Sequence, residues 1–193
     1  MYVSTATVKL GQRVPDFVLT MYDPATNEFG RFSMAEQIQK RRWTIVFFYT
    51  ADFSYACAGE FEALSRRYDD FAALGGDVIT VSTDTHHAHH AWRRHEKALA
   101  DARYKMGADP SGEVSRMFGV YDERSGLALR GTFIIAPDGM LLSAEVNFYN
   151  LARNVDELVR KFKAAEYTSR HPDEICAPDW RADGDRTLTD PGT

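Results

Sequence analysis

The sequence contains only two cysteines, Cys57 and Cys176. In a reducing compartment such a pair is more often catalytic or inert than a permanent structural bridge. Two cysteines also cannot complete a tetrahedral zinc site without histidine or carboxylate ligands. The chain has 193 residues and is long enough to bury a core of its own, so folding as one domain requires no disulfide.

Basic residues are in the minority, with 23 lysines and arginines against 28 aspartates and glutamates, a net charge of -5. Nucleic acid is therefore not expected as a partner, because phosphate binding needs a basic face. No apolar run approaches the ~18 residues that a membrane span requires, so no membrane partner is expected. The segment MYVSTATVKLGQRVPDF lacks the basic and apolar parts of a secretory signal, and we expect a cytoplasmic protein.

Internal repeats and low-complexity tracts are also absent, and the apolar pattern is that of alternating strands and helices. The nearly continuous apolar run 43–49 (WTIVFFY) and the run 77–82 (DVITVS) predict buried strands. Between them, apolar residues at helical spacing predict a helix that ends at Gly75-Gly76. These apolar residues are Phe61, Leu64, Tyr68, Phe71 and Leu74.

Shorter patterns predict the remaining elements. They are a hairpin or edge region in 1–32, an amphipathic helix over 86–100, a strand at 104–106, a short helix at 112–118, a hairpin of 132–135 with 140–146 around Pro137-Asp138-Gly139, and a helix through Val155, Leu158, Val159 and Phe162 capped by Asn150 or Asn154.

The order of these elements predicts an α/β protein with a mixed central sheet flanked by helices. From Glu166 onward the chain is polar, and we expect a mobile C-terminal tail over 166–193 after a folded domain over 1–165. The first strand, helix and following strand form a crossover, which brings ligand-binding loops to the carboxyl end of the strand. Cys57 lies there.

The surroundings of Cys57 explain how it can be reactive. If Ser54 is the N-cap, Cys57 is the third residue of the helix, where the dipole and free N–H groups favour the thiolate over the thiol. The Ser54 hydroxyl can donate to the sulfur, and Arg130 is a candidate cationic partner. The alternatives are that Cys57 is a small buried hydrophobe and Cys176 a solvated thiol without a role.

Five segments, taken together, resemble the two-cysteine peroxiredoxins of the alkyl hydroperoxide reductase peroxidase-subunit type. The family signature is Pro-x-x-x-Thr/Ser-x-x-Cys, and FFYTADFSYACAGEFEAL resembles it with Ser54 and Cys57 in place. The other segments follow in the same order, from about Gly11 to Trp180: VSTDTHHAHHAW, ADPSG, LALRGTFIIAPDG and KAAEYTSRHPDEICAPDW. The resemblance implies a thioredoxin-like fold and a thiol-dependent peroxidase without a cofactor.

The resemblance also implies a role for each matching residue. Cys57 corresponds to the peroxidatic cysteine, Ser54 to the hydroxyl that binds the peroxide, Arg130 to the arginine that stabilises the thiolate, and Glu60 to the acid that orients this arginine. Cys176 corresponds to the resolving cysteine, which in this family comes from the partner chain. The implied partners are hydrogen peroxide or an organic hydroperoxide, a thioredoxin-like or flavoprotein disulfide reductase, and further copies of the chain in a head-to-tail homodimer and a ring of five dimers.

Two positions depart from the family pattern. Thr50 stands where the signature usually has proline, which shields the thiolate pocket. Ala58-Gly59 replaces Pro-Thr after the cysteine, and a glycine in a helix costs about 0.5–1 kcal/mol relative to alanine. We therefore expect a softer first turn and a changed rate or substrate range. With no Gly-Gly-Leu-Gly insertion and no aromatic helix after Trp180, we also expect resistance to overoxidation.

Two other interpretations compete with a thiol peroxidase. The histidine-rich segment 86–95 has His86 and His90 at helical spacing, but no HExxH pattern, so we expect a solvated helix and no functional metal. The departures at the Cys57 loop leave open a thioredoxin-like interaction module or holdase chaperone without turnover. A disulfide oxidoreductase is not expected, because a Cys-x-x-Cys pair is absent.

Overall fold

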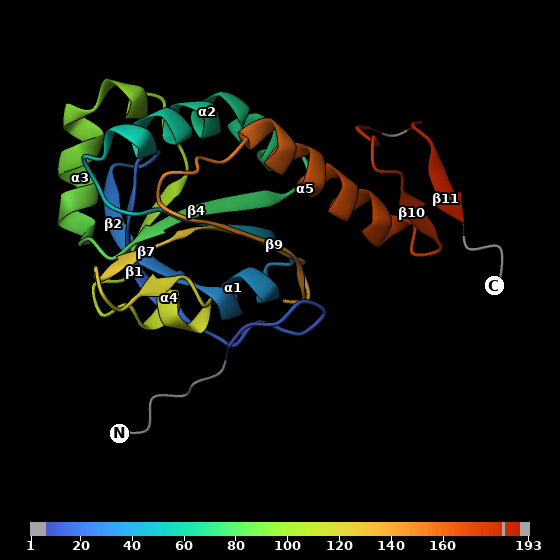
Figure 1. The fold of residues 1–193 in the computed structure, drawn as a ribbon, viewed down its shortest axis with the longest axis horizontal. Helices are drawn as coiled ribbons and strands as arrows, with labels where there is room; N and C mark the ends of the chain where they lie inside the picture. The colour runs from blue at the N-terminus through green and yellow to red at the C-terminus, as the bar shows by residue number, and fades with distance from the viewer. Residues whose placement is uncertain (1–6, 183, 190–193) are drawn as a thin grey trace.

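The structure, a computed structural model, describes residues 7–182 and 184–189 and contains one mixed sheet with helices on both faces (Figure 1). Seven strands form this sheet in the order β2-β1-β5-β4-β3-β8-β9. Their bounds are β1 Val18–Asp23, β2 Glu28–Ser33, β3 Trp43–Phe48, β4 Gly76–Ser82, β5 Lys105–Ala108, β8 Arg130–Ile135 and β9 Leu141–Asn147. The predicted α/β class and mixed sheet are confirmed.

The central strand β3 is buried along its whole length. It pairs in parallel with β4 and antiparallel with β8, so both of its edges are covered. Because side chains alternate along a strand, Ile45 and Phe47 join one apolar core while Val46 and Phe48 join a second core on the opposite face. A strand buried on both faces explains the continuous apolar run in the sequence.

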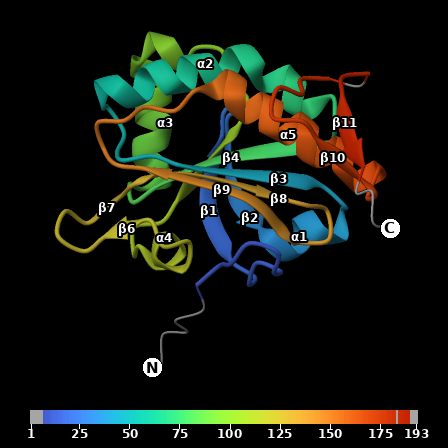
Figure 2. The same cartoon turned by 45° about the vertical axis from the view of Figure 1, so that its right-hand side comes forward.

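Five α-helices cover the sheet among the described residues. They are α1 Met34–Gln39, α2 Tyr55–Ala72, α3 His86–His95, α4 Glu113–Met117 and α5 Val155–Arg170. α2, α3 and α5 lie on one face, and α1 and α4 lie on the other (Figure 2). α5 begins at the cap Asn154, whose side chain accepts hydrogen bonds from the backbone N–H groups of Asp156 (3.0 Å) and Glu157 (3.2 Å).

Both predicted hairpins are present, since β1 pairs antiparallel with β2 and β8 with β9. The helix predicted over 86–100 is shorter than expected. α3 ends at His95, and Glu96 adopts an extended backbone conformation. The Glu96 side chain accepts a hydrogen bond from the backbone N–H of Ala98 (3.1 Å) and starts a separate 3-10 turn, η1 Lys97–Leu99. The cap competes with continuation of the helix.

The expectation of a mobile tail from Glu166 is wrong for most of the described residues beyond this point. α5 continues to Arg170, and β10 Glu174–Cys176 pairs antiparallel with β11 Thr187–Thr189. Trp180 is 1% exposed and packs against Tyr167, with ring centroids 5.2 Å apart. Aromatic packing orders a segment whose composition is otherwise polar. The division into units 1–165 and 166–193 stays a prediction.

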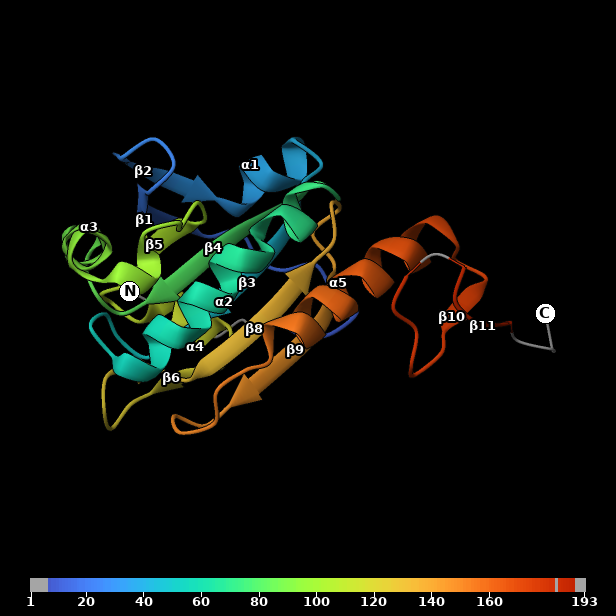
Figure 3. The ribbon, with the colours of Figure 1, turned by 90° about the horizontal axis from the view of Figure 1, so that it is seen from above.

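The β3–α2–β4 crossover places the loop 49–54 at the carboxyl end of β3. Figure 3 shows this loop and the first turn of α2 at one end of the molecule, with β10 and β11 at the other end, beyond α5. A small hairpin of β6 Tyr121–Asp122 and β7 Leu127–Ala128 lies on the same side as the loop. These placements bring residues from β3, α2, β8 and the β9–α5 connection to one site.

Candidate active site

The first turn of α2 holds Cys57 as the sequence predicts. Ser54 is the N-cap, with an extended backbone (φ -81°, ψ 126°), and Cys57 is the third helical residue. The backbone N–H groups of Cys57 and Ala58 both donate to the carbonyl oxygen of Ser54, at 3.1 Å each. The Cys57 side chain is 0% exposed, so its sulfur lies inside the protein at the positive end of a helix of 18 residues.

The loop before this helix is held by a buried polar cluster. The Tyr49 hydroxyl donates to Asp52 Oδ1 (2.6 Å), and His89 Nδ1 lies 2.8 Å from Asp52 Oδ2. His89 Nε2 donates to the carbonyl oxygen of Gly107 (3.1 Å). Burial, and then the adjacent Asp52 charge, hold the pKa of Tyr49 well above its ordinary value, so its hydroxyl keeps the proton that it donates. Asp52 therefore ties the loop to α3 and β5.

Phe53 follows this anchor in the left-handed backbone region, at φ 59°. A bulky residue pays a steric cost in this region, and such conformations persist only where the surroundings enforce them. The backbone N–H of Asp52 donates to Asp84 Oδ2 (2.8 Å), which fixes the chain just before the turn. The reversal at Phe53 turns its ring outward, 61% exposed, and aims Ser54 at the start of α2.

Two polar atoms lie next to the Cys57 sulfur. Thr50 Oγ1 is 3.2 Å from Sγ, and Arg130 Nη1 is 3.6 Å from it. Thr50 is 7% exposed and Arg130 is 2% exposed, so both contacts are shielded from water. A guanidinium and a hydroxyl can both donate a hydrogen bond to a thiolate, the nucleophilic form of cysteine.

Arg130 is fixed from two further sides. Its Nε donates to the carbonyl oxygen of Tyr149 (2.7 Å), and its Nη1 donates to Glu60 Oε2. The Tyr149 side chain is held in turn, since its hydroxyl donates to Asp122 Oδ2 (2.7 Å) and lies 2.6 Å from Ser125 Oγ. The small β6–β7 hairpin thereby stabilises the loop whose carbonyl orients Arg130.

Glu60 is shared between Arg130 and a second buried arginine, Arg153, which the sequence analysis missed. Arg153 Nε and Nη2 each lie 3.1 Å from a Glu60 oxygen, and its Nη1 donates to the carbonyl oxygen of Gly131 (2.8 Å). Burial raises the pKa of Glu60, but hydrogen bonds and charge from Arg153, with the charge of Arg130, outweigh it and leave the pKa lowered. Burial lowers the pKa of Arg153, and Glu60 opposes that shift. Glu60 is therefore a carboxylate between two cations.

The predicted site residues do not all meet. The structure brings Cys57, Glu60 and Arg130 together, and it adds Thr50 at the sulfur. Ser54 lies close in the chain, but its hydroxyl makes no capping hydrogen bond, and none joins it to Cys57 among the described residues. Cys176 lies in β10, half-buried, with its Sγ 3.9 Å from the carbonyl oxygen of Ala164.

The histidine-rich segment packs against aromatic rings. His86, His87 and His90 surround Phe29 with ring centroids 5.2, 5.1 and 5.6 Å away. Across residues 7–182 and 184–189, no group of three or more histidine, cysteine, aspartate or glutamate side chains is arranged to hold a metal ion. Only His89 from this segment enters the buried cluster around Asp52.

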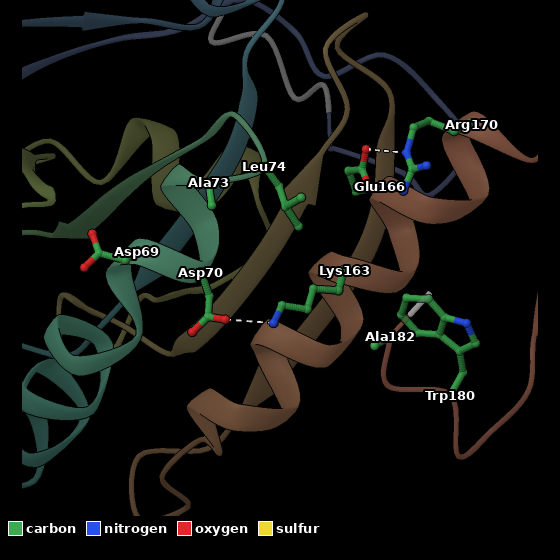
Figure 4. A pocket seen from close by; sticks show the side chains of 9 residues that line it. All are labelled: Asp69, Asp70, Ala73, Leu74, Lys163, Glu166, Arg170, Trp180 and Ala182. Atoms are coloured by element: carbon green, nitrogen blue, oxygen red, sulfur yellow. Dashed lines mark hydrogen bonds and ion pairs between the residues drawn. The ribbon is translucent and has the colours of Figure 1, made fainter. Parts of the chain in front are cut away.

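A cavity of about 610 Å³ lies far from Cys57, between the carboxyl end of α2, α5 and the segment around Trp180 (Figure 4). Its charges are paired, since Lys163 lies 2.7 Å from Asp70 and Arg170 lies 2.8 Å from Glu166. No cysteine lines it.

The fold and the site define a class: a thioredoxin-like domain with a buried cysteine thiol beside an arginine at the start of a helix. Residues 10–144 match the AhpC/TSA family. Alkyl hydroperoxide reductase C of Staphylococcus saprophyticus is 43% identical over 179 residues, which are 93% of each chain. The protein of the same name from Staphylococcus aureus is 39% identical over the same share of both chains.

Solved structures agree with this assignment. Enterococcus faecalis AhpC superposes with a TM-score of 0.81 at 38% identity, covering 87% of this chain and 98% of that chain. The reduced 2-Cys peroxiredoxin of Plasmodium vivax has a TM-score of 0.86 at 22% identity, covering 93% and 92%, and supports the fold. The chain belongs to the AhpC/TSA family. It is a peroxiredoxin, a thiol peroxidase of the oxidoreductase class.

None of the helices in the described part of the chain combines the length and the apolar composition that crossing a membrane requires.

Proposed function

We propose that this chain reduces hydrogen peroxide and organic hydroperoxides with Cys57 as the attacking thiolate, in antioxidant defence. The observation that carries the proposal is the position of Cys57 Sγ, which is buried at a helix start with Arg130 Nη1 3.6 Å away. A thiolate in this position is favoured by the guanidinium charge and by the helix dipole.

The reaction begins when the Cys57 thiolate attacks the terminal oxygen of the peroxide. An S–O bond forms, the O–O bond breaks, and the sulfur electron pair reduces the leaving oxygen to water or an alcohol once it takes up a proton. Arg130 stabilises the charge that develops on the leaving oxygen, as donors in an oxyanion hole do. Glu60 and the carbonyl oxygen of Tyr149 hold Arg130 in place. To Ser54 we assign the hydroxyl that binds the peroxide.

We assign resolution of the Cys57 sulfenic acid to Cys176 of the partner subunit. Within one chain, the first turn of α2 and β10 lie at opposite ends of the molecule (Figure 3), which disfavours attack by the same chain's Cys176. A head-to-tail dimer would bring each Cys176 to the other chain's Cys57. The Cys176 thiol displaces the hydroxyl of the sulfenic acid as water, leaving a disulfide.

We also propose an assembly, a reductant and a compartment for the protein. Five such dimers form a ring, the disulfide is reduced by a thioredoxin-like protein or a flavoprotein disulfide reductase, and the protein acts in the cytoplasm without a cofactor. Residues 1–165 carry the peroxidase site, and 166–193 carry the resolving cysteine. The support is the relation to proteins named alkyl hydroperoxide reductase C and 2-Cys peroxiredoxin.

The test compares peroxide consumption by the wild type, Cys57→Ser and Cys176→Ser with a small thiol as reductant. Cys57→Ser should lose activity, whereas Cys176→Ser should keep the first oxidation and lose the disulfide-linked dimer on a non-reducing gel. Mixing the two variants should restore some linked dimer, because a mixed pair retains one complete Cys57–Cys176 site. Activity in Cys57→Ser would refute the role of Cys57, and a linked product that stays monomeric would refute resolution by the partner.

We also propose that the protein resists overoxidation, because the first turns of α2 unwind easily. Cys57 must leave its buried position before Cys176 can reach it, and Gly59 makes that unwinding easier. We expect mass spectra of the wild type at low peroxide to show the disulfide and little Cys57 sulfinic acid. Rapid accumulation of the sulfinic acid would contradict this expectation.

A further inference from the structure

We propose that Thr50 is a catalytic residue, whose hydroxyl donates a hydrogen bond to the Cys57 thiolate. The proposal rests on the proposed role of Cys57. Thr50 Oγ1 lies 3.2 Å from Cys57 Sγ, and both side chains are buried. At this position the family signature usually has proline, which carries no side-chain donor. The chain therefore has a polar contact at the sulfur that the usual signature lacks.

The direction of this hydrogen bond follows from the charge of the sulfur. A thiol at Cys57 can either donate or accept, but a thiolate has no proton and can only accept. Arg130 Nη1, the other polar atom near Sγ, is also a donor. Ionised Cys57 thus receives two donors, and Thr50 has no second hydrogen-bond partner within the described residues. The hydroxyl proton of Thr50 is therefore available for a hydrogen bond to the sulfur.

Two consequences follow for the reaction. The hydrogen bond stabilises the charged form of Cys57, so a larger fraction of the enzyme carries the thiolate at a given pH. It also disperses charge from the sulfur, so each thiolate is a somewhat weaker nucleophile. The hydroxyl keeps its proton throughout, and the attack consumes no proton from Thr50. Thr50 also covers the sulfur, a shielding role that valine or alanine would retain in part.

The experiment uses Cys176→Ser protein as the background, so that Cys57 is its single thiol. Thiolate formation is followed by ultraviolet absorbance against pH, and peroxide oxidation by stopped flow across the same pH range. The variants are Thr50→Val, which replaces the hydroxyl with a methyl group, and Thr50→Ser, which keeps the hydroxyl. Thr50→Ala repeats the loss of the hydroxyl if the valine variant does not fold.

The matched control is Thr44→Val, a substitution in β3, the strand that leads to Thr50. Thr44 is fully buried, and its hydroxyl has no hydrogen-bond partner among residues 7–182 and 184–189. The same substitution there removes a hydroxyl from the core without touching the sulfur. It should leave both pH profiles unchanged and so shows what a buried threonine-to-valine change does by itself.

For Thr50→Val we expect the midpoint of thiolate formation to rise by about 1 pH unit, the size of one hydrogen bond to a charged group. The oxidation rate should fall about threefold on the acidic side and rise about threefold on the alkaline side, because fewer but more nucleophilic thiolates react. The two rate curves therefore cross, and Thr50→Ser follows the background protein.

An unchanged midpoint in folded Thr50→Val and Thr50→Ala would overturn the proposal. A rate lowered equally at every pH would do the same, since it would leave Thr50 only a packing role. The peroxide reaction of the background protein tests the proposed function separately. If the Cys176→Ser background does not react with peroxide, Cys57 is not the attacking thiolate, while the absorbance profile still reports whether Thr50 stabilises it.

Discussion

Glu60 and Arg153 are 93 residues apart in the sequence and are joined by three hydrogen bonds. The backbone N–H of Arg153 donates to Oε1 at 2.8 Å, and its Nε and Nη2 donate at 3.1 Å each. The guanidinium also lies over the Phe47 ring, with Cζ 3.3 Å from the centroid. Both side chains are buried, so the ion pair links α2 to the start of α5 behind the Arg130 contact.

Replacing Glu60 by glutamine should weaken the fold and the site together. The change leaves Arg130 and Arg153 buried without a compensating charge, which typically costs about 3–5 kcal/mol. Urea unfolding measures the loss of stability, and peroxide consumption should fall with it. The control is Glu62→Gln on the same helix, whose exposed pair with Arg66 should contribute less than about 1 kcal/mol. Equal losses in the two variants would contradict this role of Glu60.

Acid should remove the same contribution from the wild type. The pKa of Glu60 is lowered from its ordinary value of 4.5, so the folded protein holds the carboxylate more strongly than the unfolded chain does. This stability is present above pH 4.5 and is lost as the pH falls below it. Urea midpoints measured from neutral to acidic pH should converge for the wild type and Glu60→Gln. A gap that stays constant with pH would exclude titration of Glu60 as the cause.

Tyr149→Phe should slow the peroxidase step and leave the fold intact. The hydroxyl that holds the loop to Asp122 and Ser125 is lost, and the carbonyl that orients Arg130 becomes less well placed. Small displacements of a charged group near the reacting atoms cost roughly tenfold or more in rate. Stopped-flow oxidation measures the effect. Tyr121→Phe, whose ring packs on Arg116 instead, should retain the wild-type rate, and an equal rate in both variants would argue against positioning by Tyr149.

Two glycine-to-alanine substitutions should change the free energy of unfolding in opposite directions. A Cβ at Gly59 meets nothing within 4 Å, so Gly59→Ala should stabilise α2 by about 0.5–1 kcal/mol. A Cβ at Gly76 would lie 2.9 Å from Phe162 Cζ and 2.9 Å from the carbonyl oxygen of Phe71, so Gly76→Ala should destabilise by about 1–3 kcal/mol. Thermal or urea unfolding checks both. On the proposed mechanism, Gly59→Ala also yields more Cys57 sulfinic acid, because its first turns unwind less readily.

The sequence predicts the central strands, α2 and the position of Cys57 at its start well, because the apolar periodicity of these elements is local. Ser54 is the N-cap residue as expected, although its hydroxyl makes no capping hydrogen bond. Arg153 could not be predicted in this way, because no local sequence pattern distinguishes a buried arginine before a helix from an exposed one. His89 is likewise hidden among four neighbouring histidines, and only the positions of Asp52 and Gly107 in the fold make it a buried partner. α5 continues past residue 165, where Tyr167 packs against Trp180. This contact forms only after the chain reverses direction, so local sequence does not predict it.

The burial of Cys57 makes access to its sulfur depend on movement of the surrounding side chains. A sulfur that is 0% exposed is out of reach even of a water molecule, so every reagent needs some movement of the surrounding side chains, and a small reagent needs the least. A disulfide needs more room, because attack on it runs along the line of the two sulfur atoms. The closed loop therefore hinders exchange of Cys57 with disulfides more than its reaction with a peroxide. On the proposed mechanism, this difference in access, before any difference in reactivity, keeps the Cys57 thiol available for its oxidant.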